Sequence, residues 1–393
     1  PSWKRDVKPK IVWRGKFLRI AMVRSSFLKG SGQAVHVTEI AKRLLRLGHH
    51  VIVISREIEQ KPKEVPMCEF DFVGDRFPCL RNLVFPFRSL SFLRDFDIVH
   101  THYHPCVFVG NLANKVLEKP HVFTYHGFAP VRIWRDPKQR LKMIDHRIGT
   151  FFALRLGVDR VIAVSRYLKS ELTKNYKIDE SLIEVIYNGI DAGLFNPNVR
   201  GDEIRQRHGL EDKPVVLYLG RLAPYKGVQF LMRAVPLVLR EVPNAKFLVA
   251  GSMRYEMLNL HGIAKSLGIE GSVIFTGFVP SRLVPKLYAC CDVFCYPSLW
   301  EGFGLTPGEA EASGKPVVAF NTCAIPEVVE DGRTGILVEP RNYIQLASAI
   351  VSLLKDWDLR RKMGLEARRR VLRLFSWDNA VNQTLKLYKE VLS

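Results

Sequence analysis

Short apolar runs, each followed by a glycine turn and an amphipathic stretch, divide the chain into two similar halves. In the first half, Phe17–Val23 precedes Gly30 and Gly32, and apolar residues then recur at helical spacing. In the second half, Val215–Leu219 precedes a glycine turn, and helical spacing follows over Val228–Arg240. Strand, glycine turn, helix and strand in this order are typical of Rossmann-like units. The pattern therefore predicts an α/β protein with two doubly wound domains.

Further short apolar runs follow in both halves, as expected of buried strands in parallel sheets. We expect strands at 98–99, 122–125 and 161–164, and then at 246–250, 273–275, 293–296, 317–320 and 336–338. Residues 341–373 have a basic, helical pattern. We divide the chain into a basic N-terminal extension (1–16), an N-terminal domain (17–195), a polar linker (196–213), a C-terminal domain (214–375) and a last helix (376–393) that packs back toward the N-terminal domain.

The charge is unevenly distributed along the chain. Residues 1–200 hold 34 Lys and Arg against 19 Asp and Glu, whereas the remaining residues hold 25 against 20. This excess suits nucleic acid, anionic lipid or a phosphorylated substrate, and a solubilising surface would explain it equally well. The seven cysteines are odd in number and scattered, which favours reduced thiols and a cytoplasmic location. No apolar run is long enough to predict a membrane span.

The segment Glu301-Gly-Phe-Gly-Leu-Thr-Pro-Gly-Glu309 follows a predicted strand and leads into a helix. The backbone N–H groups of Leu305 and Thr306 would begin that helix without intrahelical partners, which makes a site for a diphosphate. Glu301 and Glu309 would repel a phosphate, but carboxylates accept hydrogen bonds from sugar hydroxyls. The segment therefore fits a sugar nucleotide. An ordinary strand, loop and helix fits the residues equally well.

A second segment, Gly220-Arg-Leu-Ala-Pro-Tyr-Lys-Gly227, forms the turn after another predicted strand. Arg221 can hold phosphate oxygens through two N–H groups, and Lys226 adds a point charge. Together they would neutralise a leaving diphosphate. For either residue alone, a solvated cation beside a turn is the simpler interpretation.

These two segments, in this order, resemble the motifs of the retaining glycosyltransferases of family 4, which have the two-domain GT-B fold. The resemblance extends from about Phe17 to the C-terminus. Further matching motifs are the glycine loop at 30–32, Asp97-Ile-Val-His100, Tyr125-His-Gly127, Ala163-Val-Ser165, Asn188-Gly-Ile-Asp191, Thr276-Gly-Phe278 and Ile325-Pro-Glu-Val-Val329 with Asp331-Gly332.

The resemblance implies a role for several of the matching residues in binding a nucleotide-diphosphate sugar. Arg221 and Lys226 would bind the diphosphate, together with the N–H groups of Leu305 and Thr306. The other implied contacts are Glu309 with the ribose, Glu301 with the sugar hydroxyls, the N–H groups of Phe303 and Gly304 with the same sugar, Phe278 near the base, Gly32 at a close backbone approach, and His126 near the reaction centre. Without the resemblance, His126 would be interpreted as structural and Phe278 as a core residue.

The resemblance also implies a mechanism in which the sugar–diphosphate bond breaks through an oxocarbenium-like state and the acceptor attacks from the same face. We expect no metal cofactor, because neither donor motif contains an Asp-x-Asp pair. We expect a hexosyltransferase acting on a lipid-linked, phosphorylated or glycan acceptor in envelope, glycolipid or polysaccharide biosynthesis. UDP-sugars are candidate donors, although the sequence does not distinguish the base, and it does not reveal the oligomeric state.

The basic, partly apolar segment Val131–Arg147 suggests a helix lying on an anionic membrane, and an ordinary solvated helix is an equally good interpretation. Other functions also remain open. A sugar-nucleotide epimerase or a phosphorylase could have the same fold, and a non-catalytic sugar-nucleotide binder would show the same motifs. A nucleic-acid-binding protein would fit the charge, but the sequence has no zinc-finger spacing, RNP motif or GXXG loop.

Overall fold

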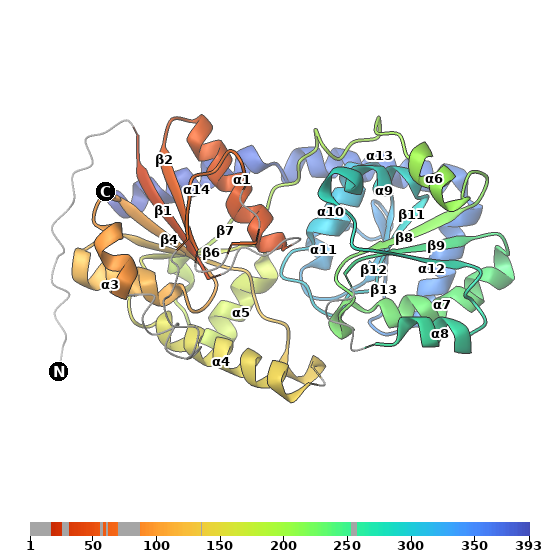
Figure 1. Ribbon diagram of the computed structural model, residues 1–393, viewed down its shortest axis with the longest axis horizontal. Helices are drawn as coiled ribbons and strands as arrows, with labels where there is room; N and C mark the ends of the chain where they lie inside the picture. Colours follow the sequence, from red (N-terminus) through yellow and green to blue (C-terminus); the bar gives the residue numbers. More distant parts are fainter. Residues whose placement is uncertain are drawn as a thin grey trace.

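The computed structural model describes residues 17–25, 31–55, 58–59, 62–69, 87–134, 136–252 and 258–393, which form two α/β domains side by side (Figure 1). The N-terminal domain contains a seven-stranded parallel sheet of order β3-β2-β1-β4-β5-β6-β7. Its strands are β1 (Arg19–Arg24), β2 (His50–Ser55), β3 (Met67–Glu69), β4 (Ile98–His102), β5 (His121–Tyr125), β6 (Arg160–Ala163) and β7 (Ile183–Val185). The central strands are buried on both faces, which explains their continuous apolar runs.

Helices cover both faces of this sheet. They include α1 (Gly32–Arg46), α3 (Val107–Leu117), the 3-10 turn η1 (Val131–Ile133), α4 (Pro137–Ala153) and α5 (Arg166–Tyr176). The last helix, α14 (Trp377–Leu392), belongs to the C-terminal end of the chain but lies beside α1 (Figure 1). Its buried Trp377, Val381 and Leu387 share one hydrophobic cluster with Ile20 and Val37 of the N-terminal domain. The chain therefore crosses between the domains twice.

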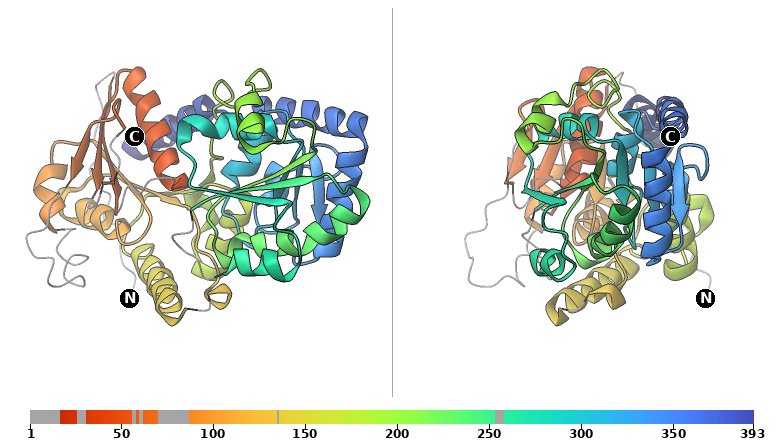
Figure 2. Two further views of the ribbon diagram at one scale, coloured as in Figure 1. Left: turned by 45° about the vertical axis from the view of Figure 1, so that its right-hand side comes forward. Right: turned by 90° about the vertical axis from the view of Figure 1, so that its right-hand side faces the viewer.

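The C-terminal domain contains a six-stranded parallel sheet of order β10-β9-β8-β11-β12-β13, again with helices on both faces (Figure 2). The strands are β8 (Val215–Leu219), β9 (Lys246–Ala250), β10 (Val273–Gly277), β11 (Val293–Tyr296), β12 (Val317–Phe320) and β13 (Gly335–Val338). The helices are α6 (Asp202–His208), η3 (Pro224–Lys226), α7 (Val228–Glu241), α8 (Leu260–Ser266), α9 (Val284–Cys290), α10 (Leu305–Ala312), α11 (Ile325–Val328), α12 (Tyr343–Lys355) and α13 (Trp357–Leu374).

The predicted fold class is confirmed, and the differences concern single elements. The basic segment 341–373 is two helices, because the carboxylate of Asp356 caps the start of α13 by accepting the N–H of Leu359 at 2.8 Å. The segment 196–213, which we expected to be a linker, contains α6 with a buried Ile204. The edge strands β3 and β7 have only three residues each, too few to show a periodic pattern.

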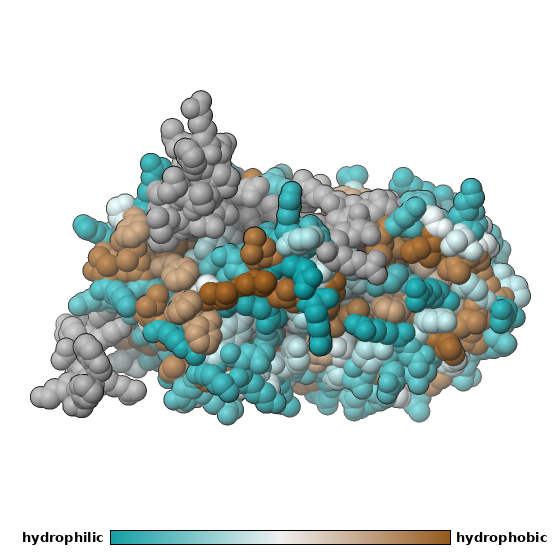
Figure 3. Space-filling view, turned by 90° about the horizontal axis from the view of Figure 1, so that it is seen from below, coloured by the Kyte–Doolittle hydropathy of each residue, from teal (hydrophilic) through white to brown (hydrophobic). Residues whose placement is uncertain are grey.

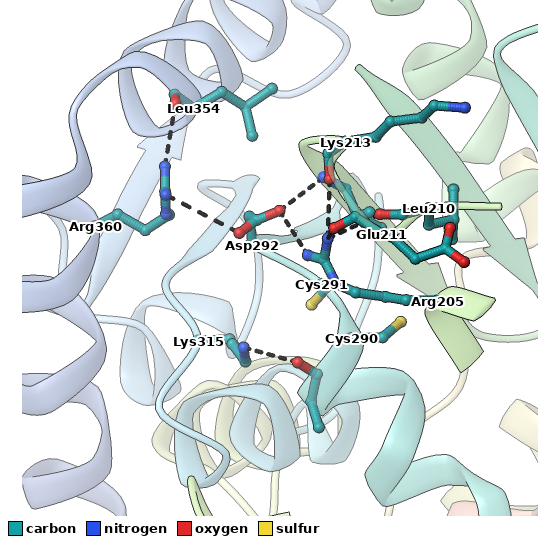
Figure 4. Close-up of polar contacts among 12 residues, drawn as sticks. Arg205, Leu210, Glu211, Lys213, Cys290, Cys291, Asp292, Lys315, Leu354 and Arg360 are labelled. Carbon is teal, nitrogen blue, oxygen red and sulfur yellow. Dashed lines mark hydrogen bonds and ion pairs between the residues drawn. The ribbon is translucent and has the colours of Figure 1, made fainter. Parts of the chain in front are cut away.

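A polar network holds the amino ends of the C-terminal strands (Figure 4). Asp292, directly before β11, accepts the backbone N–H of Val215 at 2.8 Å and pairs with Arg205 at 3.1 Å. Arg360 of α13 lies 4.0 Å from the same carboxylate. The network thus fixes α6 and α13 against the beginning of β8 and β11, at the sheet edge opposite the carboxyl ends of these strands, where ligands bind in open α/β sheets.

Within the described ranges, no helix combines the length and the apolar character needed to cross a membrane.

Candidate active site

A buried ion pair lies at the carboxyl ends of β8 and β11. Lys226 Nζ is 2.5 Å from Glu301 Oε1, and the hydroxyl of Tyr296 accepts from Lys226 at 2.8 Å. The same carboxylate oxygen accepts hydrogen bonds from Tyr296 at 2.7 Å and from Ser298 at 2.8 Å. Three donors therefore converge on Oε1, and Oε2 has no hydrogen-bond partner among the described residues. That second oxygen can accept a hydroxyl group of a ligand.

Close packing of two loops brings the pair together. Gly227 follows η3 with a φ of +73°, and a Cβ added there would lie 1.7 Å from the carbonyl oxygen of Pro297. Only glycine allows both this backbone conformation and this approach. The loop after β8, which carries Lys226, therefore packs directly against the loop after β11, which carries Glu301.

Burial is the largest influence on Lys226 and lowers its pKa. The Glu301 carboxylate opposes this effect, and the positive charge of Arg221 adds to it. Arg221 itself is exposed, and its guanidinium lies 5.6 Å from the centre of the Tyr225 ring. The structure thus places both predicted cations at one end of the sheet, with Lys226 already bound to Glu301 and Arg221 at the surface.

The start of α10 has the features of an anion site. Gly304 has a φ of +116° and precedes Leu305, and the first turn contains no acidic residue. The leading N–H groups of a helix lack intrahelical partners, and the helix dipole favours negative charge there. The side chain of Phe303 packs on Phe375 with ring centres 5.5 Å apart, so only its backbone is available to a ligand. Leu305 and Thr306 remain candidates for binding phosphate through their N–H groups.

The second motif carboxylate has a different environment from the first. Glu309 Oε2 accepts a hydrogen bond from Tyr288 at 2.8 Å, and no cation takes part. Burial raises the pKa of Glu309 to about 7, although the Tyr288 hydroxyl opposes the shift. Near neutral pH, Glu309 is therefore a mixture of protonated and ionised forms, whereas Glu301 is held as half of an ion pair.

The N-terminal domain contacts the same loop. A Cβ on Gly302 would lie 2.4 Å from the carbonyl oxygen of His126, which follows β5. A Cβ on Gly32, at the start of α1, would lie 3.1 Å from Leu305 Cδ1. Two residues predicted from the first half of the chain, Gly32 and His126, therefore adjoin the Glu301 loop and the start of α10. The candidate site lies where the two domains meet.

His126 belongs to a buried histidine cluster. Its ring centre is 4.9 Å from that of His36 and 5.8 Å from that of His102. Burial lowers the pKa of all three, and the nearby guanidinium of Arg24 lowers it further. His36 bonds Asn188 at 2.8 Å, whereas both ring nitrogens of His102 and Nε2 of His126 have no hydrogen-bond partner among the described residues. This side of the site is lined by neutral imidazoles.

Among the described residues, two groups of side chains have the spacing of metal ligands. Neither group contains a residue of the segments 220–227 or 301–309, and His126 is the one predicted site residue among them. In the first, ring nitrogens of His36, His102 and His126 lie within 4.8 Å of one another, but the charge of Arg24 opposes a bound cation. The second comprises His104, Asp145 and His146.

The remaining predicted residue, Phe278, follows β10 and is 44% exposed, so it does not pack in the core.

Sequence reasoning also missed several features. Tyr296, which binds Glu301, looks like a core residue in an apolar run, and Tyr288 belongs to a matching motif, Leu287-Tyr288, without its contact with Glu309 being predicted. His102 could have been found, because it forms a His-x-His pair with His100 at the end of β4. Two Asp-x-Asp pairs, at 95–97 and 356–358, were overlooked, and both lie outside the donor motifs. Asp97 pairs with Arg19 at 2.8 Å, and Asp356 caps α13.

Comparison with known proteins gives matches over almost the whole chain. Residues 30–194 match the family Glycosyltransferase Family 4, and residues 201–370 match Glycosyl transferases group 1. An uncharacterised glycosyltransferase of Methanocaldococcus jannaschii is 29% identical and covers 95% of this chain and 98% of its own length.

A GDP-mannose-dependent alpha-(1-6)-phosphatidylinositol monomannoside mannosyltransferase of Mycolicibacterium smegmatis is 35% identical over 70% of this chain and 71% of its own length. The crystal structure of Anabaena HepE in complex with UDP and glucose has a TM-score of 0.81, with 22% identity over 95% of this chain and 99% of that chain. This structural likeness confirms the GT-B fold. The two family matches and the mannosyltransferase relative together show that the chain belongs to the family 4 glycosyltransferases.

Proposed function

We propose that this glycosyltransferase moves a hexosyl unit from a nucleotide-diphosphate sugar to a hydroxyl acceptor, with retention of configuration at the anomeric carbon. The main support is the Lys226–Glu301 pair, which joins the loop after β8 to the loop before α10, where Gly302 adjoins His126 of the other domain. Cations and a carboxylate gathered around one point between the domains support a donor that has both a diphosphate and sugar hydroxyls.

The donor's diphosphate would bind at the start of α10, with Arg221 and Lys226 beside it. Oε2 of Glu301 would accept a hydroxyl of the hexose, and Glu309 would accept a ribose hydroxyl. Backbone N–H groups of Phe303 and Gly304 would assist with the hexose, and Phe278 would lie near the base. Fixed donors and cations of this kind stabilise charge that develops on a leaving group.

In the reaction, the bond between the anomeric carbon and the diphosphate oxygen breaks, and its electron pair leaves with the diphosphate. Arg221, Lys226 and the helix start stabilise the resulting negative charge. The acceptor oxygen bonds to the anomeric carbon from the same face, and its proton passes to the leaving phosphate. His126 would contact the sugar near this centre. Because Glu301 Oε1 already accepts three hydrogen bonds, the carboxylate is better suited to binding hydroxyls than to attacking carbon.

We further propose that the reaction needs no metal cofactor and that the acceptor is lipid-linked, phosphorylated or a glycan, used at the inner face of a membrane in envelope, glycolipid or polysaccharide synthesis. The names of the two relatives support hexose donors but differ in the base, because one uses GDP-mannose and the other was solved with UDP and glucose. A UDP-hexose and GDP-mannose are therefore the first donors to test.

The test is a screen of UDP-, GDP- and ADP-hexoses for hydrolysis and for transfer to added acceptors, with and without a chelator. We expect one donor class to release nucleoside diphosphate, at a rate that the chelator leaves unchanged. A requirement for Mn²⁺ would contradict metal independence. Release of an isomerised sugar nucleotide, or of sugar 1-phosphate, would instead indicate an epimerase or a phosphorylase.

A further inference from the structure

The outer face of α4 carries a row of exposed apolar side chains. Leu141, Ile148 and Phe152 are 69%, 53% and 57% exposed, and Ile144 and Leu156 extend the same surface. At roughly 100° per residue, the first three fall within about 40° of one another around the helix axis. The opposite face is the one that packs on the domain, through the buried residues Met143, His146, Thr150 and Ala153. We call the exposed row, residues 141, 144, 148, 152 and 156, the α4 ridge.

Basic side chains border the α4 ridge on both sides. Lys138 and Lys142 lie on one side by helical spacing, and Arg140 lies on the other; all three are exposed. Arg155, just beyond α4, is also exposed, but its guanidinium donates to the carbonyl oxygens of Phe151 and Tyr176 at 2.8 Å each. Asp145 is the single acidic residue of Pro137–Ala153. An apolar line flanked by Lys and Arg is the arrangement of helices that lie in the interface of an anionic bilayer, where apolar side chains enter the acyl boundary and basic heads meet lipid phosphates.

The α4 ridge lies on one accessible side of the molecule. In two views α4 follows the underside of the N-terminal domain, below the region where the domains meet (Figures 1 and 2). Seen from below, hydrophobic residues gather there among hydrophilic ones (Figure 3). A helix of 17 residues is about 26 Å long, enough to contact several lipid headgroups.

The helix also adjoins the active site. The segment between β5 and α4 contains His126 and Trp134, and the ring centre of Trp134 is 5.3 Å from that of Tyr225 in the C-terminal-domain loop that carries Lys226. Inside the domain, Arg147 of α4 donates to the carbonyl oxygen of Phe128 at 2.8 Å. A surface bound to α4 would therefore lie beside the interdomain site.

We propose that the α4 ridge and its flanking Lys138, Arg140 and Lys142 dock the enzyme onto a bilayer containing anionic lipids. This inference deepens the proposed function and rests on it for the reason why the enzyme would dock. It assigns the membrane contact to one helix face. An acceptor held in the bilayer could then reach the site without leaving the membrane. The sequence pattern suggested residues 131–147, and the structure extends the contact to Phe152 and Leu156.

The experiment is flotation of the full chain with vesicles of phosphatidylcholine alone or mixed with phosphatidylglycerol. We expect binding to the mixed vesicles, weakened by added salt. The variant L141D/I148D should lose binding, and K138Q/K142Q should bind roughly 20-fold more weakly, at about fivefold per basic residue. The matched control is I344D/L372D, which changes two similarly exposed apolar residues of the C-terminal domain and should float like wild type.

Thermal unfolding would show that each variant is folded, and hydrolysis of a nucleotide sugar in solution should stay at the wild-type rate. Failure of the wild type to float with anionic vesicles would overturn the proposal, as would flotation of L141D/I148D equal to wild type. If the wild type binds no vesicles but forms a dimer, and L141D/I148D dissociates that dimer, the α4 ridge is a self-association surface instead. If flotation depends on α4 but no donor is hydrolysed, the proposed chemistry fails while the docking surface stands.

Discussion

The two domains contribute opposite kinds of surface to one site. On the C-terminal side, the Lys226–Glu301 pair is buried and each of its charges is hydrogen-bonded. On the N-terminal side, His102 and His126 are buried neutral rings with nitrogens that have no partner among the described residues. Both charges on the C-terminal side are thus hydrogen-bonded before a ligand arrives, and we call this the complete side, although Glu301 Oε2 has no partner among the described residues. The N-terminal side, with two buried rings that retain unused hydrogen-bonding capacity, is the incomplete side. Under the proposed function, the contrast implies that the charges of the C-terminal side are preorganised and that the N-terminal side is completed by its ligand.

The largest expected effect comes from removing the cation of the complete side. Lys226→Met would leave Glu301 buried without its partner, and breaking a buried pair costs about 3–5 kcal/mol. We also expect the rate of transfer to fall roughly 10²–10³-fold, as it does when one charge-stabilising donor is lost. Steady-state kinetics and urea unfolding measure the two effects.

A second variant separates stability from catalysis. K226M/E301Q removes both charges, so we expect much of the lost stability to return while transfer stays slow. Lys265→Met, at an exposed position of α8, is the control and should change neither. Wild-type rates in a folded Lys226→Met protein would show that the pair does not act on the donor.

The next effect concerns pH and the second carboxylate. With a pKa raised to about 7 by burial, Glu309 ionises between pH 6 and 8, and its ionised form is the better acceptor of ribose hydroxyls. Donor affinity should therefore rise about tenfold over this range. In Glu309→Gln, which does not titrate, the affinity should be flat. Calorimetric titration at several pH values tests this, and equal slopes in both proteins would contradict the assigned role.

Stability should show the opposite dependence on pH. The folded state holds its proton to a higher pH than the unfolded state does, because the pKa of Glu309 is raised on folding. The stabilisation is complete below the ordinary glutamate pKa and is lost as pH rises through about 7. The difference in unfolding free energy between wild type and Glu309→Gln should therefore decline from pH 5 to pH 8.

Sequence patterns predicted the fold well because parallel strands are buried on both faces and stand out as apolar runs. The strands 215–219 and 246–250 have the predicted bounds. Short edge strands lacked such a signal. The glycines around the donor motifs were equally informative, since Gly227 and Gly304 occupy backbone conformations that favour glycine.

What the sequence did not reveal are contacts between distant residues. Nothing in the run Val293–Tyr296 shows that the Tyr296 hydroxyl leaves the core to bind Glu301 and Lys226. Likewise, the raised pKa of Glu309 depends on how deeply Glu309 is buried, which spacing along the chain does not determine. The motif order predicted which residues gather at the interdomain site, and tertiary packing decides their charge states.

A smaller effect is expected where the two sides are joined. Glu327 of α11 accepts the N–H groups of Arg166 and Tyr167 at 2.8 Å each, at the start of α5 in the other domain, and the Tyr187 hydroxyl at 3.0 Å. Glu327→Ala should lower the unfolding free energy by about 2 kcal/mol, because charged hydrogen bonds and a favourable helix-dipole contact are lost. Urea unfolding measures the loss. Glu241→Ala, which breaks an exposed pair with Lys355 that solvent screens, is the control and should cost much less than Glu327→Ala.

The smallest expected effect tests the incomplete side. His102→Leu replaces a fully buried ring, whose nitrogens have no partner among the described residues, with an apolar side chain of similar size. Such a change is nearly neutral or stabilising, so we expect the unfolding free energy to stay within about 0.5 kcal/mol or to rise. Tyr296→Phe on the complete side should instead cost about 1.5–3 kcal/mol, because it removes hydrogen bonds to both charges of the pair. If urea unfolding shows that His102→Leu is as destabilising as Tyr296→Phe, then the His102 ring already has partners in the free enzyme, and the two sides of the site do not differ as described.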